Sequence, residues 1–180
     1  LDLIFTNAPV TNHNFSISSG NENFGYAISG GAFNQSGLIK NSGFERYNAS
    51  VRVIGQYNER MSYGLNLNTI YANHDRVPAN APYFGRPPGI VYSAMVHSPV
   101  IKPYNDDGTP NQLDGQSYLG NGTTSASNPL AIIDGIKEEL NNHRSFGTIF
   151  ADIKISPGLV FKSLLGSDLN NYTGSFYRAN

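Results

Sequence analysis

Residues 46–57, RYNASVRVIGQY, alternate between apolar and polar side chains. An extended strand places successive side chains on opposite faces, so this period of two predicts a β-strand with two different surroundings. The apolar face of that strand carries Tyr47, Ala49, Val51, Val53, Gly55 and Tyr57. The opposite face carries Arg46, Asn48, Ser50, Arg52 and Gln56, and Ile54 is its one apolar exception.

The same alternation recurs along the chain and predicts an all-β, antiparallel strip of about six strands. Their approximate ranges are 11–20, 23–35, 44–57, 60–75, 143–156 and 159–172. Short turns at 21–23, at 58–60 and at Pro157-Gly158 join these strands in pairs. Residues 77–143 hold eight of the ten prolines, which cannot donate to a β ladder, so we expect one long external loop there.

Short turns therefore alternate with longer connections, and all the short turns lie at one end of the sheet. This arrangement is typical of transmembrane β-barrels. The ten residues from Tyr47 to Tyr57 would span roughly 25 Å along the membrane normal at about 3.3 Å per residue and a tilt of about 40°. Because that height matches the apolar band of an outer-membrane barrel, the two tyrosines fit its aromatic girdles.

A soluble fold offers another explanation of the same pattern. In a secreted β-sandwich that acts as a carbohydrate-binding or adhesin module, the apolar face would pack against a second sheet and the tyrosines would pair across strands. The polar, sparsely charged back of the strands suits a water-filled passage but would also suit the outside of such a sandwich. We keep this binding module as the alternative to the barrel.

Composition supports extended structure and narrows the possible partners. The 180 residues include 19 glycines and 11 tyrosines, while only 14% are charged and 39% are apolar. The formal net charge of −1 gives no electrostatic reason to expect a nucleic acid as partner. The absence of cysteine excludes disulfides and thiolate metal sites, and no apolar run is long enough for a membrane helix.

No residues form a recognisable catalytic, cofactor-binding or metal-binding constellation, so we expect no enzymatic activity, no cofactor and no metal. The run around Asp106 and Asp107 lacks the spacing of a calcium loop and predicts a turn held by Asx side chains. Four scattered histidines lack the spacing of a metal pair: His13, His74, His97 and His143. Neither a Gly-x-Ser-x-Gly elbow nor a phosphate-binding glycine loop occurs.

Two features of the long connection stay open. Residues 129–142 place several apolar residues on one side of a possible helix, but Gly135 lies inside it, so helix and loop remain alternatives. Aromatic side chains suited to stacking on sugars either contact a substrate or pack the loop against itself: Tyr83, Phe84, Tyr92, Tyr104 and Tyr118. No substrate-binding residue can be assigned.

Several ordered motifs resemble those of SusC/RagA-type TonB-dependent outer-membrane transporters. They lie at 8–10 (APV), 12–14 (NHN), 34–37 (NQSG), 42–47 (SGFERY), 98–109 (SPVIKPYNDDGT), 128–131 (NPLA) and 157–169 (PGLVFKSLLGSDL). The resemblance covers essentially the whole chain. Such transporters have about 22 strands around a plug, and closed outer-membrane barrels need at least eight, so residues 1–180 resemble an early strip of barrel wall that begins after the plug.

The resemblance implies a function for the parent protein. It would import a large nutrient, a glycan fragment or an oligopeptide, across the bacterial outer membrane. Energy would come through TonB, engaged by a plug region outside this chain, and a SusD-like lipoprotein would act as a lid. The strip itself would contact outer-membrane lipid on one side.

Overall fold

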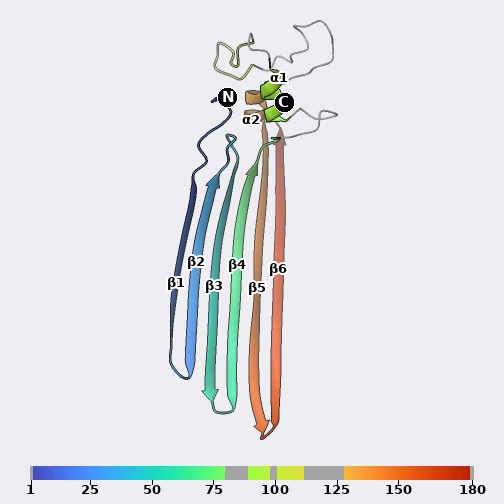
Figure 1. Cartoon of the computed structure of the whole chain (residues 1–180). Helices are drawn as coiled ribbons and strands as arrows, with labels where there is room; N and C mark the ends of the chain where they lie inside the picture. The colour runs from blue at the N-terminus through green and yellow to red at the C-terminus, as the bar shows by residue number, and fades with distance from the viewer. Residues whose placement is uncertain (1, 80–88, 98–100, 112–127, 179–180) are drawn as a thin grey trace.

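Six strands form a single antiparallel sheet in the order β1-β2-β3-β4-β5-β6 in the computed structural model of the chain. The structure describes residues 2–79, 89–97, 101–111 and 128–178. The strands are β1 Val10–Gly20, β2 Phe24–Ser36, β3 Gly43–Asn58, β4 Met61–Arg76, β5 Ile136–Ser156 and β6 Leu159–Arg178. Each strand pairs with the strand that follows it in the sequence, as Figure 1 shows. The predicted six-stranded, all-β antiparallel strip is therefore confirmed.

Short turns close one end of the sheet, which we call the short-turn end. At the first turn the side-chain oxygen of Asn21 accepts hydrogen bonds from the backbone N–H groups of Asn23 and Phe24, both at 2.9 Å. At the second, Asn58 accepts from the N–H of Arg60 at 2.9 Å. Gly158 has a φ of 88°, which favours glycine at the third turn. These residue types suit tight hairpins, as the sequence predicted.

The opposite, long-loop end carries both chain termini and two short helices, α1 Ile90–Val96 and α2 Pro129–Gly135 (Figure 1). Helix α2 begins at Asn128, whose side chain accepts a hydrogen bond from the N–H of Leu130, and Pro129 suits the first helical turn. The sequence left helix and loop open over 129–142. The chain is helical only to Gly135, and β5 then begins at Ile136, seven residues earlier than predicted.

The early start of β5 has a non-local cause. Residues 137–140, KEEL, favour a helix by propensity. Pairing with both neighbours overrides this preference, because β4 extends to Arg76 and faces Glu138 while β6 continues to Arg178 and faces Ile136. Arg76 and Glu138 also form an ion pair at 3.7 Å. The connection between β4 and β5 is consequently shorter than the predicted 77–143 and holds a helix, α1, that the sequence did not predict.

The apolar core lies at the long-loop end and outside the sheet faces. It consists of Ile4, Ile90, Leu130, Ile132, Ile133 and Ile136, all at most 7% exposed. Ile4 comes from the segment before β1, which pairs with the β2–β3 connection through Phe5 and Ile39. The core therefore joins the N-terminal segment, the β2–β3 connection and both helices into one cap at this end.

Neither face of the sheet is covered in the part of the chain that the structure describes. The main contacts between elements run from each strand to its neighbour, from α1 to α2 and from α2 to β5. Large apolar side chains stay exposed as a result; Leu164 and Leu165, on opposite faces of β6, are 70% and 71% exposed. The second sheet that a β-sandwich requires is not among the described elements.

Candidate functional site: the two faces of the sheet

The strand register arranges one face of the sheet into apolar rows that cross several strands. One row joins Ile17, Ile28, Val51 and Leu67 from β1 to β4, and the next joins Tyr26, Val53, Leu65, Ile149 and Leu165 from β2 to β6. We call this side the apolar face. Directly paired residues point the same way, so a single strand's alternation extends over the whole sheet.

Tyrosine rows border the apolar face at both ends. Toward the long-loop end, Tyr47 pairs directly with Tyr71. Their hydroxyls donate to groups one step closer to that end, Tyr71 to Asn141 at 2.7 Å and Tyr47 to Glu45 at 3.4 Å. Tyrosine thus keeps its ring on the apolar rows and turns its hydroxyl toward polar groups, as it does at a membrane interface.

Tyr63 marks the other border, where it pairs with Gly55. The register of the β3–β4 pair shifts between Gln56 and Asn58, so Tyr57, the predicted border residue, lies within this irregularity. Eight residues separate the Tyr47 and Gly55 rows, a height of roughly 20 Å at a strand tilt of about 40°. The three rows between them carry no charged side chain on this face in any of the six strands.

The opposite side, which we call the polar face, carries hydroxyl, amide and charged groups at the same heights. One row joins Ser16, Ser29, Ser50, Asn68, Phe146 and Asp168. The hydroxyls of Ser29 and Ser50 lie 2.6 Å apart. Arg144 donates two hydrogen bonds to Asp168, at 2.9 and 2.5 Å, and the pair is about half exposed. Such groups require water or polar partners, which lipid does not supply.

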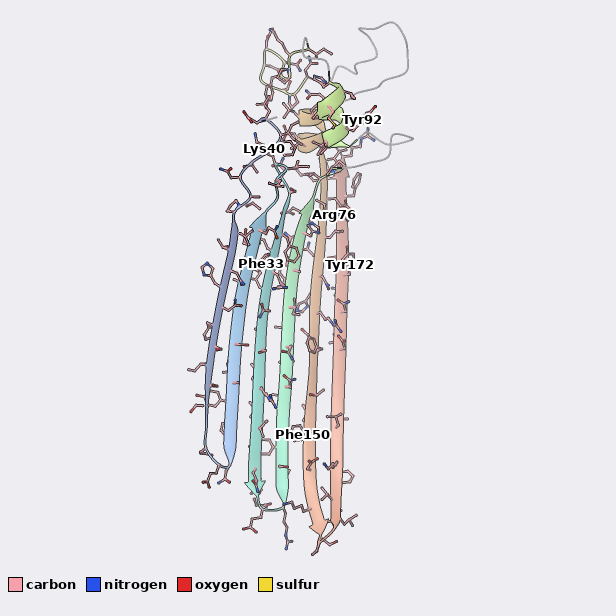
Figure 2. All side chains as sticks on the ribbon, viewed as in Figure 1. Phe33, Lys40, Arg76, Tyr92, Phe150 and Tyr172 are labelled. Carbon is pink, nitrogen blue, oxygen red and sulfur yellow. The ribbon has the colours of Figure 1, made fainter. Side chains whose placement is uncertain are left out.

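Several aromatic side chains interrupt the polar face. Figure 2 shows Phe33 and Tyr172 toward the long-loop end and Phe150 toward the short turns. Phe150 pairs with Gly64 and its ring fills the space that a side chain at Gly64 would need. Aromatic rings over strand glycines shield the backbone and help to fix the register of the pair.

The other candidate groups of the sequence do not converge. His13 and His143 lie on the apolar face, His74 on the polar face and His97 at the end of α1. No group of three or more His, Cys, Asp or Glu side chains suited to a metal occurs among the described residues. Asp107 accepts hydrogen bonds from the backbone and side chain of Thr109, at 2.9 and 2.6 Å, which confirms the predicted Asx-type turn.

Of the aromatic residues of the long connection, Tyr92 lies on α1 and Tyr104 forms a bridge with Pro110. Tyr83, Phe84 and Tyr118 lie outside the described residues. Neither described helix is long and apolar enough to cross a membrane.

Comparison with known proteins shows what the chain is similar to. The chain is 29% identical over 177 residues to TonB-dependent receptor P3 of Formosa agariphila and 25% identical over 185 residues to TonB-dependent receptor SusC of Bacteroides thetaiotaomicron. It matches the solved structure of the RagAB peptide importer in its closed-closed state with a TM-score of 0.68 and 26% identity, over 99% of the chain. The chain resembles a strip of SusC/RagA-type β-barrel wall.

The chain is short beside these relatives. It spans 17% of the length of receptor P3, 18% of SusC and 19% of the matched RagAB chain. No family model matches it. The resemblance inferred from the sequence motifs is confirmed, and the matched relatives are receptors and transporters.

Proposed function

We propose that the segment forms wall of an outer-membrane transporter that imports a large nutrient, with its apolar face against lipid and its polar face toward the passage. The observation that carries this proposal is the difference between the two faces at one height. Between the Tyr47 and Gly55 rows the apolar face has no charge, while the polar face holds Arg52, Arg144 and Asp168. A charged side chain on the lipid side of a barrel costs roughly 2–4 kcal/mol near the midplane.

The relatives support the coarser part of the proposal. Receptor P3 and SusC are named as TonB-dependent receptors, and RagAB is described as a peptide importer. By analogy, the parent protein would draw energy through TonB, would work with a SusD-like lipoprotein, and would carry a glycan fragment or an oligopeptide. The segment would contribute wall and lining and no catalysis. Analogy in fold alone does not specify the solute.

A pair of cysteine variants tests the orientation of the faces in the full-length protein. The 180 residues contain no cysteine, so a reporter introduced in this segment is unique within it. Ser50 lies on the polar face and Val51, its neighbour, on the apolar face. In outer-membrane vesicles, Ser50→Cys should react with a water-soluble maleimide, while Val51→Cys should react only after detergent exposes it. Equal reaction of both variants before detergent would refute the proposed wall.

A further inference from the structure

The charges of the polar face do not balance. Between the Arg76 row and the Lys154 row, strand residues of this face include three carboxylates, Glu138, Asp152 and Asp168. The same area carries six cationic side chains, Arg46, Arg52, Arg76, Arg144, Lys154 and Lys162.

Each of these three carboxylates forms an ion pair with one of the six cations. Glu138 pairs with Arg76 at 3.7 Å, Asp152 with Lys162 at 3.7 Å and Asp168 with Arg144 at 2.5 Å. Three cations therefore remain without a carboxylate partner among the described residues: Arg46, Arg52 and Lys154. This face therefore contributes a positive potential to the proposed passage, which would attract anionic solutes.

Only one of the three lies among aromatic rings. The guanidinium carbon of Arg46 is 5.6 Å from the centre of the Phe33 ring, close enough for a cation–π contact. Phe33 lies 6.0 Å from Phe44, and Phe44 meets His74 edge-on at 5.9 Å. We call these four side chains the cation–aromatic platform: Phe33, Phe44, Arg46 and His74.

The platform is accessible and has room beside it. The side chains of Arg46 and His74 are exposed, while both phenylalanine rings are half-buried. On β4 the residue paired with Arg46 is Ala72, whose methyl group leaves space next to the guanidinium. Figure 2 places Phe33 toward the long-loop end of the sheet, where a solute entering from that end would arrive first.

The chemistry of the platform selects its ligand. The guanidinium of Arg46 lies near the Phe33 ring and pairs with no described carboxylate, so its planar N–H groups can bind a bidentate anion such as a carboxylate or a sulfate. The phenylalanine rings offer apolar contact to whatever carries that anion. We propose that the cation–aromatic platform binds an anionic group of the transported solute at the long-loop end of the passage. This inference rests on the proposed function, since the platform lines the passage only if the polar face does.

The test uses the full-length protein in outer-membrane vesicles with Asn48→Cys, one row below Arg46 on the polar face, as reporter. An uncharged maleimide labels this cysteine alone or with one of four probes: hexaglutamate, hexaglutamine, dextran sulfate and unsulfated dextran. Ala49→Cys, on the apolar face, serves as the orientation control. If Asn48→Cys does not react without probe, the proposed orientation fails, and the platform with it.

Given labelling of Asn48→Cys, an anionic probe should slow the reaction and its neutral counterpart should not. Protection by hexaglutamate alone would indicate a peptide carboxylate, and protection by dextran sulfate alone a glycan sulfate. Adding Arg46→Gln should raise the concentration of anionic probe that halves the labelling rate by roughly fivefold, which corresponds to the free energy of one exposed ion pair. The matched control Arg52→Gln removes an unpaired cation for which the described residues provide no cation–π contact, and it should raise the required probe concentration much less than Arg46→Gln does.

Two results would overturn the platform while leaving the passage intact: equal protection by charged and neutral probes, or equal protection with and without Arg46→Gln. If Arg46→Gln does not assemble, Phe33→Leu keeps the apolar bulk and removes the ring under the guanidinium, and it should weaken protection in the same direction.

Discussion

The ring of Tyr63 lies directly over Gly55 on the neighbouring strand, in the space that a side chain at Gly55 would fill. This contact closes the border of the apolar face at the short-turn end. It also explains why a glycine follows Val51 and Val53 on the apolar face near the end of β3, although glycine by itself weakens a strand.

We expect Gly55→Ala to destabilise the full-length barrel by about 1–3 kcal/mol, because the new methyl group would force the Tyr63 ring aside. Urea unfolding in detergent micelles would measure the loss. Gly25→Ala is the matched control, since a side chain there meets nothing within 4 Å. If Gly55→Ala and Gly25→Ala lowered the free energy of unfolding equally, the packing of the Tyr63 ring would not depend on the missing side chain at Gly55.

The same cation placed on one face of β3 or on the other should lower the stability by different amounts. Val51→Arg introduces a cation into the uncharged rows of the apolar face and should cost roughly 2–4 kcal/mol in lipid vesicles. Ser50→Arg puts the same side chain on the polar face and should cost less than about 1 kcal/mol. Reversible unfolding in vesicles, followed by tyrosine fluorescence, would compare them. A larger penalty for Ser50→Arg would contradict the assignment of the faces.

Asn128 joins the start of helix α2 to the segment 101–111. Its side chain is 1% exposed, accepts from the N–H of Leu130 at 3.0 Å and donates to the carbonyl oxygens of Pro103 at 2.8 Å and Asn111 at 2.6 Å. Asn128→Ala removes all three hydrogen bonds and leaves the buried N–H of Leu130 without its acceptor, so we expect about 1–3 kcal/mol of local destabilisation. Hydrogen exchange of residues 101–111 and 129–135 in the full-length protein should rise, while exchange in the strands should not.

Asn128→Asp separates the two roles of this side chain. The aspartate keeps the acceptor for the N–H of Leu130, but it places an oxygen that cannot donate against two carbonyl oxygens. We therefore expect the protection from hydrogen exchange in Asn128→Asp to be no higher than in Asn128→Ala. Full protection in Asn128→Asp would mean that helix capping alone matters. Lys102→Ala, whose side chain is 80% exposed, is the control within the same segment.

The turn at Asp107 should depend on pH. Hydrogen bonds from the side chain and backbone of Thr109 lower the pKa of the Asp107 carboxyl below its ordinary value of 3.8. A lowered pKa in the folded turn means that the ionised carboxylate stabilises the turn above the ordinary aspartate range, and that this contribution is lost as the pH falls through the lowered pKa. Exchange of the Thr109 amide, corrected for intrinsic rates, should be slow near about pH 7 and faster near about pH 3.

Asp107→Asn should remove this pH dependence, because the amide oxygen accepts the same bonds without titrating. Asp106→Asn is the neighbouring control: that carboxylate is fully exposed and its one ion pair among the described residues is with Lys102, at 3.6 Å, so the pH response should persist. A pH response that disappears in Asp106→Asn instead would place the titrating group elsewhere.

Local sequence patterns predicted the strands because successive side chains of each strand alternate between an apolar and a polar surrounding. The alternation in 46–57 predicts both its own extension and the separation of Val51 from Ser50. The tight turns were also predicted from the sequence, because the side chains of Asn21 and Asn58 accept hydrogen bonds from backbone N–H groups only two or three residues further along the chain.

What the sequence did not reveal depends on contacts between distant segments. Helix α1 begins at Ile90, which is fully buried in a core that includes Ile4 and Ile133, and nothing near residue 90 signals that core. The cation–aromatic platform likewise depends on the register of β2, β3 and β4, which brings Phe33, Arg46 and His74 together from three strands. Spacing within any one strand does not show it.

The outer edges of β1 and β6 pair with no other described strand, over 11 and 20 residues respectively. Hydrocarbon provides no hydrogen-bond partners for the unpaired backbone N–H and C=O groups of these edges. Such a sheet can therefore lie in a bilayer only when both of its edge strands are paired with other strands. In the proposed barrel, this segment would therefore have to stay shielded from the acyl chains during assembly until the barrel closes, and in isolation its unpaired edges would promote association between chains.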